Sequence, residues 1–177
     1  TGAPTKSSYK ATNWLTNGNP PAGWECLGYI PEDGFTETVD KGNGDPIRDI
    51  NLDTIDSVPG AATESITVGL MEVAKAPLAA EYGSANVSES GGTIEVKHNW
   101  GDADEHYQYV FLLLLKNSRS WTKYIPDGQV TELGDFTGNK TTVAQREITI
   151  TYNTDDNGNG CFDWIDSVTT TTTTTGA

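Results

Sequence analysis

The stretch REITITY, residues 146–152, decides how the rest of the sequence is interpreted. Apolar Ile148, Ile150 and Tyr152 alternate with Glu and Thr residues. Successive side chains of a β-strand point to opposite faces, so the alternation predicts a strand with one buried and one solvated face. An amphipathic helix would instead repeat its apolar residues every three or four positions.

Two other stretches, residues 65–70 and 93–100, show the same alternation. Their apolar positions are Ile66, Val68 and Leu70 in the first and Ile94, Val96 and Trp100 in the second. Turn-forming residues are frequent between such stretches, with 19 Gly and 8 Pro in the chain. Short strands separated by turn signals are typical of an all-β sandwich or barrel, so we expect a mainly β fold.

Residues 107–115, YQYVFLLLL, are apolar on both faces of the predicted strand. Such a strand must be covered on both sides, by a second layer or by a partner subunit. We therefore place it in the core of the sandwich, with the one predicted helix over it. That helix covers residues 76–82, with Pro77 in its first turn and Gly83 as its stop.

The chain is acidic, with 25 Asp and Glu against 11 Lys and Arg and a formal net charge of −14. This charge disfavours specific binding to nucleic acid and to anionic membranes. The longest apolar run, residues 110–115, is too short to span a bilayer. No apolar segment typical of a secretory signal is visible near the start, so we expect a soluble protein made in a cytoplasm.

The two cysteines, Cys26 and Cys161, do not form the pattern of a disulfide framework. Reduced thiols are the simpler interpretation, and a single bridge between the two remains open. The N-terminal residues 1–13 are interpreted as an arm of a domain that covers residues 1–168.

Candidate catalytic motifs have simpler structural explanations. Glu32 and Asp33 lie between Pro31 and Gly34, which is typical of a tight turn rather than of paired catalytic carboxylates. The stretch GNGDP, residues 42–46, lacks the Lys and the following helix of a phosphate loop. No G-x-S-x-G motif occurs. We expect no enzymatic activity and assign no catalytic or cofactor-binding residue.

Residues 98–106, HNWGDADEH, combine both histidines of the chain with three carboxylates. The candidate metal ligands are His98, Asp102, Asp104, Glu105 and His106. Their spacing fits no standard metal site, and an acidic loop between two strands explains them equally well. We favour the loop and assign no metal ligand here.

Residues 155–166, DDNGNGCFDWID, can be interpreted as a calcium loop or as a hairpin turn. Asp155, Asn157 and Asn159 occupy the first, third and fifth positions of an EF-hand loop, and Asp166 the twelfth. Such loops lie between helices, however, and the preceding residues predict a strand. We favour the turn. The alternative function is a calcium-dependent β-sandwich module that binds carbohydrate or mediates adhesion.

Residues 169–175 are seven consecutive threonines, followed by Gly and Ala. They are interpreted either as a solvated, disordered segment or as an extended arm, since β-branched residues favour strands. An ordered arm of this composition would lie along a neighbouring molecule, where it can add a strand to a sheet. The domain organisation is therefore 1–168 for the domain and 169–177 for a Thr-rich arm.

The order of several motifs resembles that of a known family. These are WECLGYIPEDGFTETVD (24–40), IRDI (47–50), TESITVGLMEVAKAPLAAEYGSANV (63–87), DEHYQYVFLLLLKN (104–117), IPDGQVTELGDFT (125–137) and REITITYNTDDNGN (146–159). Over residues 14–166 the chain resembles the major tail proteins, or tail tube proteins, of long-tailed, siphovirus-type bacteriophages, notably those that infect actinobacteria. The resemblance carries no implication for the Thr-rich segment.

The resemblance implies a structural virion protein with a β-sandwich or barrel fold, one short flanking helix and long loops. Six copies would form a ring around a continuous β-barrel, and stacked hexamers would form the conduit for genome ejection. The implied partners are tape measure, terminator and distal tail proteins, with DNA passing through the lumen without specific binding. Assembly would occur in the host cytoplasm, and the protein would end in the virion tail.

Two expectations connect this picture to the residues. An acidic balance suits a pore for a polyanion, because like charge on the wall keeps DNA from adhering. The long polar segment 34–58 is the candidate loop between stacked rings.

Overall fold

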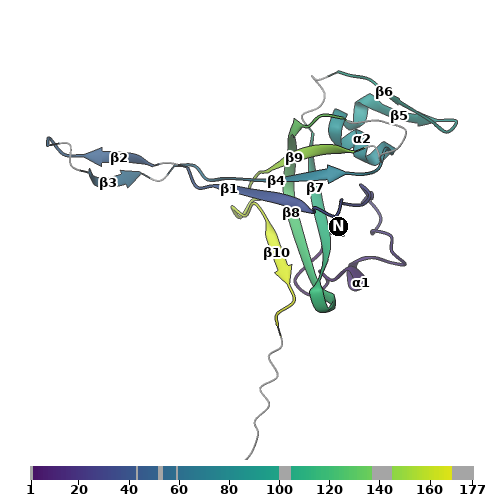
Figure 1. Cartoon of the computed structure of the whole chain (residues 1–177), viewed down its shortest axis with the longest axis horizontal. Coiled ribbons are helices and arrows are strands. Elements are labelled where there is room, and N and C mark those ends of the chain that lie inside the picture. Colours follow the sequence, from purple (N-terminus) through teal and green to yellow (C-terminus); the bar gives the residue numbers. More distant parts are fainter. Residues whose placement is uncertain are drawn as a thin grey trace, which may run out of the picture.

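The computed structural model describes residues 2–42, 44–51, 54–58, 60–99, 105–136 and 145–168. As predicted, the fold is mainly β, with a curled main sheet (Figure 1). The strands are β1 Phe35–Asp40, β2 Asp45–Arg48, β3 Thr54–Val58, β4 Thr63–Leu70, β5 Val87–Ser90, β6 Thr93–Val96, β7 His106–Leu115, β8 Arg119–Leu133, β9 Arg146–Tyr152 and β10 Phe162–Ile165. The helices are α1 Ala11–Trp14 and α2 Lys75–Tyr82, with 3₁₀ turns η1 Ser84–Asn86 and η3 Lys116–Ser118. No helix in these ranges is long and apolar enough to cross a membrane.

The main sheet is antiparallel and has the order β1-β4-β9-β8-β10, with β7 also paired to β8. The long strand β8 connects its two parts. On one side β8 pairs with β7, and on the other it pairs first with β10, over 121–124, and then with β9, over 128–133. Register shifts occur near Tyr107 and Val130, as expected where a sheet bends.

The curl encloses one core of apolar side chains from β4, β7, β8 and β9. Its buried members are Ile66, Val68, Leu70, Tyr109, Phe111, Ile125, Ile148, Ile150 and Tyr152. The strands predicted from alternation at 65–70 and 146–152 are confirmed, with the predicted faces buried. Residues 93–96 also form a strand, whereas Trp100 lies outside the described residues. Gly128 is required where the layers approach, because a Cβ there would lie 2.7 Å from the Tyr109 ring and 2.8 Å from Ile150.

Strand β7 is covered on one face and only in part on the other, where Leu112 is half-buried and Leu114 is 77% exposed, so the predicted cover of both faces is only partly found. Tyr109 and Phe111 point into the core. On the opposite face Leu112 is in register with Thr122 of β8 and Trp164 of β10. The first part of the N-terminal segment lies over this second face, where Thr122 donates a 2.6 Å hydrogen bond to the Tyr9 carbonyl, whereas Leu27 and Ile30 pack against the core. Several rings pack there, namely Tyr9, Trp14, Trp24, Tyr124, Phe162 and Trp164.

Asp166 attaches the N-terminal segment to the end of β10. Its carboxylate accepts hydrogen bonds from the Tyr9 hydroxyl and the Ser120 backbone N–H, and it forms a 2.9 Å ion pair with Lys10. The Ser120 N–H, the Tyr9 hydroxyl and the Lys10 ammonium hold the pKa of Asp166 well below its usual range. The charged carboxylate is therefore the form that stabilises this attachment.

We expect Asp166→Asn to lower the melting temperature at pH 7 more than at pH 3. The folded-state pKa is depressed, so the stabilisation is fully present above the unfolded pKa of about 3.9 and is lost as the pH falls below it. Thermal melts of both proteins at the two pH values test this. An equal fall in melting temperature at both pH values would show that the charge of Asp166 does not stabilise the attachment of the N-terminal segment.

Helix α2 agrees with the prediction for 76–82, including the buried Pro77 and Gly83 with φ +88° at the C-cap. Its position differs from the prediction, because it packs mainly against β5 and η1 rather than over β7. Arg146 of β9 holds it there through Glu81, at 3.0 Å, and the Tyr82 hydroxyl, at 2.6 Å. The prediction of a single helix is also wrong, because four-residue α1 is too short to leave a periodic signal.

The segment 34–58 is not one long loop, which corrects the prediction. Phe35–Asp40 forms β1 in the main sheet, and β2 and β3 pair as an antiparallel hairpin that projects from the body (Figure 1). We call this hairpin, residues 45–58, the arm. Its described strand residues are exposed, so it has no buried face to produce the alternation by which the other strands were found.

Candidate functional site

The surface of the sheet opposite the core carries a row of small hydroxyl side chains. Paired residues of neighbouring strands point to the same side, so the register of β1, β4, β9 and β8 defines its members. We call it the hydroxyl face, and its residues are Thr36, Thr38, Thr63, Ser65, Thr67, Thr131, Thr149 and Thr151. All are half-buried or exposed.

Hydrogen bonds between hydroxyl groups connect the strands across this face. Thr67 of β4 contacts Thr149 of β9 at 3.0 Å between Oγ1 atoms. Thr131 of β8 contacts Thr151 of β9 at 2.8 Å. Cross-strand Thr pairs of this kind stabilise a sheet and fix short side chains in place. The result is a flat, uncharged surface without large apolar groups.

The charged residues on the same side are acidic. Register places Asp40, Glu132 and Glu147 on the side of the hydroxyl face, at the ends of β1, β8 and β9. No Lys or Arg occupies a position on this side of the four strands within their described pairing. A surface with hydroxyls and carboxylates but no cation cannot form ion pairs with phosphate groups.

Two edges of this part of the sheet are free. β1 pairs only with β4, and at the other end Val130–Leu133 of β8 lie beyond the residues that pair with β7. Within the described ranges neither edge has another backbone partner. Unpaired strand edges are sites for pairing with another chain.

A buried lysine joins the two parts of the sheet. The Lys123 side chain is fully buried, and its Nζ lies 2.7 Å from Glu37 of β1 and 2.8 Å from Asp163 of β10. Tyr152 donates a 3.2 Å hydrogen bond to Glu37, and Trp121 donates a 2.6 Å hydrogen bond to Asp163. Burial alone lowers the pKa of Lys123, but the hydrogen bonds to the two carboxylates outweigh it and the net pKa is raised.

Sequence reasoning did not find this cluster. Lys123 alternates with Trp121 and Ile125 on the inward face of β8. A lysine at an apolar position of this alternation was the sequence feature that could have predicted a buried, paired charge. Cys161 lies next to it, with Sγ 3.6 Å from Nζ, and burial raises the pKa of its thiol to about 11. Both cysteines are free, so the bridge left open by the sequence is absent.

The metal candidates around residues 98–106 point in different directions. The His98 ring packs on Tyr82 at 4.7 Å, His106 contacts Asp127 at 2.7 Å, and Glu105 accepts from the Ser84 hydroxyl at 2.8 Å. Asp102 and Asp104 lie outside the described residues. Across the described part of the chain no cluster of three such ligands occurs. Glu32 and Asp33 form the expected turn, closed by the Gly34 N–H and the Pro31 carbonyl at 2.9 Å.

Residues 155–160 form a compact turn. Asp155 Oδ1 accepts hydrogen bonds from the backbone N–H of Asn157 at 2.9 Å and of Asn159 at 2.8 Å. Strand β10 then separates Asp155 from Asp166, whose carboxylate holds Tyr9 and Lys10. The first and twelfth positions of the calcium motif are therefore not brought together.

We accordingly expect millimolar calcium to leave the melting temperature unchanged, because a ligand stabilises a protein only if it binds the folded state. Thermal melts with calcium and with chelator test this, and magnesium at the same concentration controls for ionic strength. A rise specific to calcium would restore the binding module as a candidate.

Comparison with known proteins gives one result. A family model described as phage tail tube protein matches residues 1–176. No curated protein matches the chain.

Proposed function

Because this chain belongs to the phage tail tube protein family, as its match over residues 1–176 establishes, we propose that six copies form a ring with the hydroxyl faces turned inward. The protein is a structural subunit of the tail tube and a component of the virion tail. We further propose that stacked hexameric rings form the conduit for genome ejection.

The single observation that carries this orientation is the chemistry of the hydroxyl face. DNA is a polyanion, and proteins that hold it do so mainly through Lys and Arg contacts to phosphate. The side of the sheet with hydroxyls, Asp40, Glu132 and Glu147 offers no such contact within its described residues. A wall of this kind lets DNA pass without binding it.

The two free edges support closure into a ring. β1 of one copy would pair with the free edge of β8, residues 130–133, of the next. This is a head-to-tail contact, which closes into a ring if the rotation between copies allows it. Closure also removes edges that would otherwise aggregate.

The arm would connect neighbouring rings. It carries the exposed apolar side chains Ile47, Ile50 and Ile55, and Ile50 is 97% exposed. Exposed apolar residues grouped on a projecting element are typical of an interaction surface. We place their contacts on the adjacent ring.

Other parts of the proposal rest on the family. We propose a siphovirus-type phage, tape measure, terminator and distal tail proteins as partners, and assembly in the host cytoplasm. We also propose that the protein needs no cofactor and catalyses no reaction.

Negative-stain electron microscopy of the concentrated protein tests the proposed function. Rings or tubes of uniform diameter are expected. Only separate monomers, at high concentration and in the presence of other tail proteins, would contradict it.

Lysines on the hydroxyl face should make the tube bind DNA. We expect tubes of the Thr38→Lys/Thr131→Lys variant to bind linear DNA at low salt and to release it steeply as salt increases. Both positions are exposed, so the fold should tolerate the change. The matched control is Ser88→Lys/Ser90→Lys on β5, away from this face. Equal DNA binding by the two variants in a co-sedimentation assay would contradict the inward orientation.

A further inference from the structure

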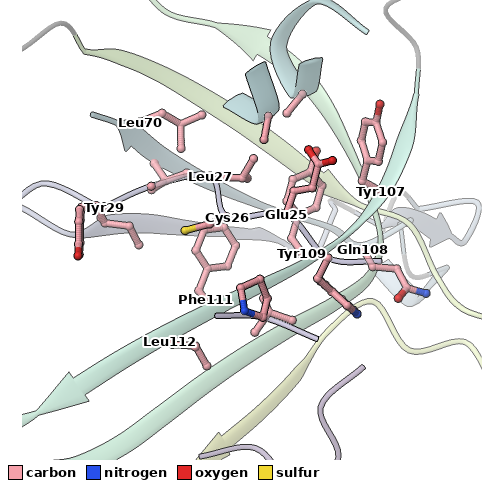
Figure 2. Close-up of a pocket in the computed structure, with 18 of the residues that line it drawn as sticks. Glu25, Cys26, Leu27, Tyr29, Leu70, Tyr107, Gln108, Tyr109, Phe111 and Leu112 are labelled. Atoms are coloured by element: carbon pink, nitrogen blue, oxygen red, sulfur yellow. The ribbon is translucent and has the colours of Figure 1, made fainter. Parts of the chain in front are cut away.

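A groove of about 1330 Å³ runs along the outer edge of β7. Every residue from His106 to Leu114 lines it, including side chains from both faces of the strand. The opposite wall is the segment 22–31 (Figure 2), with α2 at one end. Because both faces of β7 contribute, the groove follows the strand edge itself rather than one face of the sheet.

In the part of the chain that the structure describes, both walls have backbone groups without a backbone partner. Within the described ranges β7 makes backbone hydrogen bonds only to β8, on its other side. Residues 25–30 of the opposite wall make no backbone hydrogen bond to another described residue. Backbone N–H and C=O groups are nearly always paired when they are buried. A slot with such walls therefore suits an extended chain that pairs as an added strand.

The charge of the groove limits what can occupy it. The carboxylates that line it are Glu25 and Glu72, and no Lys or Arg contributes. The arm of a neighbour carries four Asp residues and one Arg in its sequence, a net charge of −3, so like charges would oppose its insertion. An uncharged segment avoids this repulsion.

We propose that the Thr-rich segment 169–177 of a neighbouring copy enters this groove and pairs with β7. Its sequence, TTTTTTTGA, has no charged side chain, and β-branched threonines favour the extended conformation. The proposal rests on the tube assembly proposed above and adds a specific contact between its subunits.

Register places the donor and the acceptor in different copies. Trp121 of β8 pairs with Leu113 of β7 on one side and with Ile165 of β10 on the other. β10 and the exposed Val168 that follows it therefore lie on one side of the β7–β8 hairpin, and the groove of the same copy lies on the other side. To reach the groove of its own copy, the Thr-rich segment would have to pass around the hairpin, and the residues that do so could not pair with β7. The segment of a neighbouring copy can pair with β7 along its whole length.

Cys26 is exposed and is one of the residues that line the groove (Figure 2), so a native thiol can report the occupant. We expect mild oxidation of concentrated full-length Thr172→Cys protein to give a ladder of disulfide-linked oligomers on a non-reducing gel. Adding Cys26→Ser should abolish the ladder. The matched control for random collision is Ser90→Cys, an exposed position on β5, which should give about tenfold less product.

Two other results of the oxidation experiment would contradict the proposal. A fast-migrating linked monomer would show that the segment occupies its own groove and would overturn the proposal. Linkage no greater than in Ser90→Cys protein would overturn it as well. Electron microscopy of the same samples separates the two hypotheses: tubes without linkage contradict only the segment contact, and linkage without tubes contradicts only the tube function.

A second measurement does not depend on a new cysteine. In assembled full-length protein, alkylation of Cys26 should be about tenfold slower than in assembled protein truncated after Val168, because the segment covers the thiol. Circular dichroism and thermal melts confirm that the truncated protein is folded. Equal alkylation rates would contradict the proposal.

Discussion

Replacing Lys123 with alanine is expected to lower the free energy of unfolding by about 3 kcal/mol. Removing one partner of a buried ion pair costs about 3–5 kcal/mol, because the remaining charge loses its partner. The lower value applies here, since Glu37 and Asp163 keep 30% and 37% of their side-chain surface exposed and water can partly solvate them. Urea denaturation of the two proteins at pH 7 measures the difference.

Two control variants separate charge from packing. Lys123→Met keeps most of the buried aliphatic stem, so any loss that it shares with the alanine variant comes from the ammonium group. Lys116→Ala removes an exposed lysine from the turn η3 and should change stability by less than about 0.5 kcal/mol. If Lys123→Ala lowers the free energy of unfolding by less than about 1 kcal/mol, the ion pairs with Glu37 and Asp163 do not contribute substantially to stability.

The Lys123 contribution should not vary across neutral pH. Its folded-state pKa is raised, so the stabilisation is fully present below the unfolded pKa of about 10.4 and is lost only as the pH rises through the folded value. Between pH 6 and pH 9 the difference between the two proteins should therefore stay constant, which a series of urea titrations can test.

The sequence predicts those elements of this fold that have one buried and one solvated face. Residues 146–152 and 65–70 show this pattern, and both are strands with the predicted faces in the core. The helix α2 was found from Pro77 and Gly83, whose backbone constraints are local. The arm was missed because the strand residues whose burial the structure describes, 45–48 and 54–56, are exposed on both faces and give no alternation of apolar and polar positions.

The hydroxyl face and the Lys123 cluster could not be predicted from the sequence, because both are formed by strands that are distant from one another along the chain. Thr149 and Thr151 alternate visibly, but only the register shows that Thr67 and Thr131 join them on one face. Lys123 takes its partners from β1 and β10, 86 and 40 residues away. The turn favoured over a calcium loop at 155–166 depended on local signals, namely the turn residues and the strand pattern before them, and β10 follows this turn.

Deleting the arm should abolish tube formation and leave the subunit folded. The chain approaches itself at the base of the arm, where a Cβ on Gly42 would lie 2.6 Å from the Ala61 carbonyl oxygen. Residues 43–59 can therefore be replaced by two glycines without moving β1 or β4. No described residue of the arm belongs to the buried core, so the melting temperature should change by less than about 4 °C, the shift that about 1 kcal/mol produces.

Point variants in the arm test whether its apolar side chains carry the contact between rings. Ile50→Ser/Ile55→Ser removes two exposed isoleucines, and Val73→Ser removes an exposed apolar side chain elsewhere as the matched control. We expect the arm variant to form single rings or no assemblies in negative-stain images, and the control to form tubes of normal length. Buried at an interface, each isoleucine would contribute about 1.5–3 kcal/mol, so the loss of two from every subunit contact should prevent stacking. Tubes of unchanged length from the arm variant would show that stacking depends on other residues, and unchanged tubes from the deletion would exclude the arm from the contact altogether.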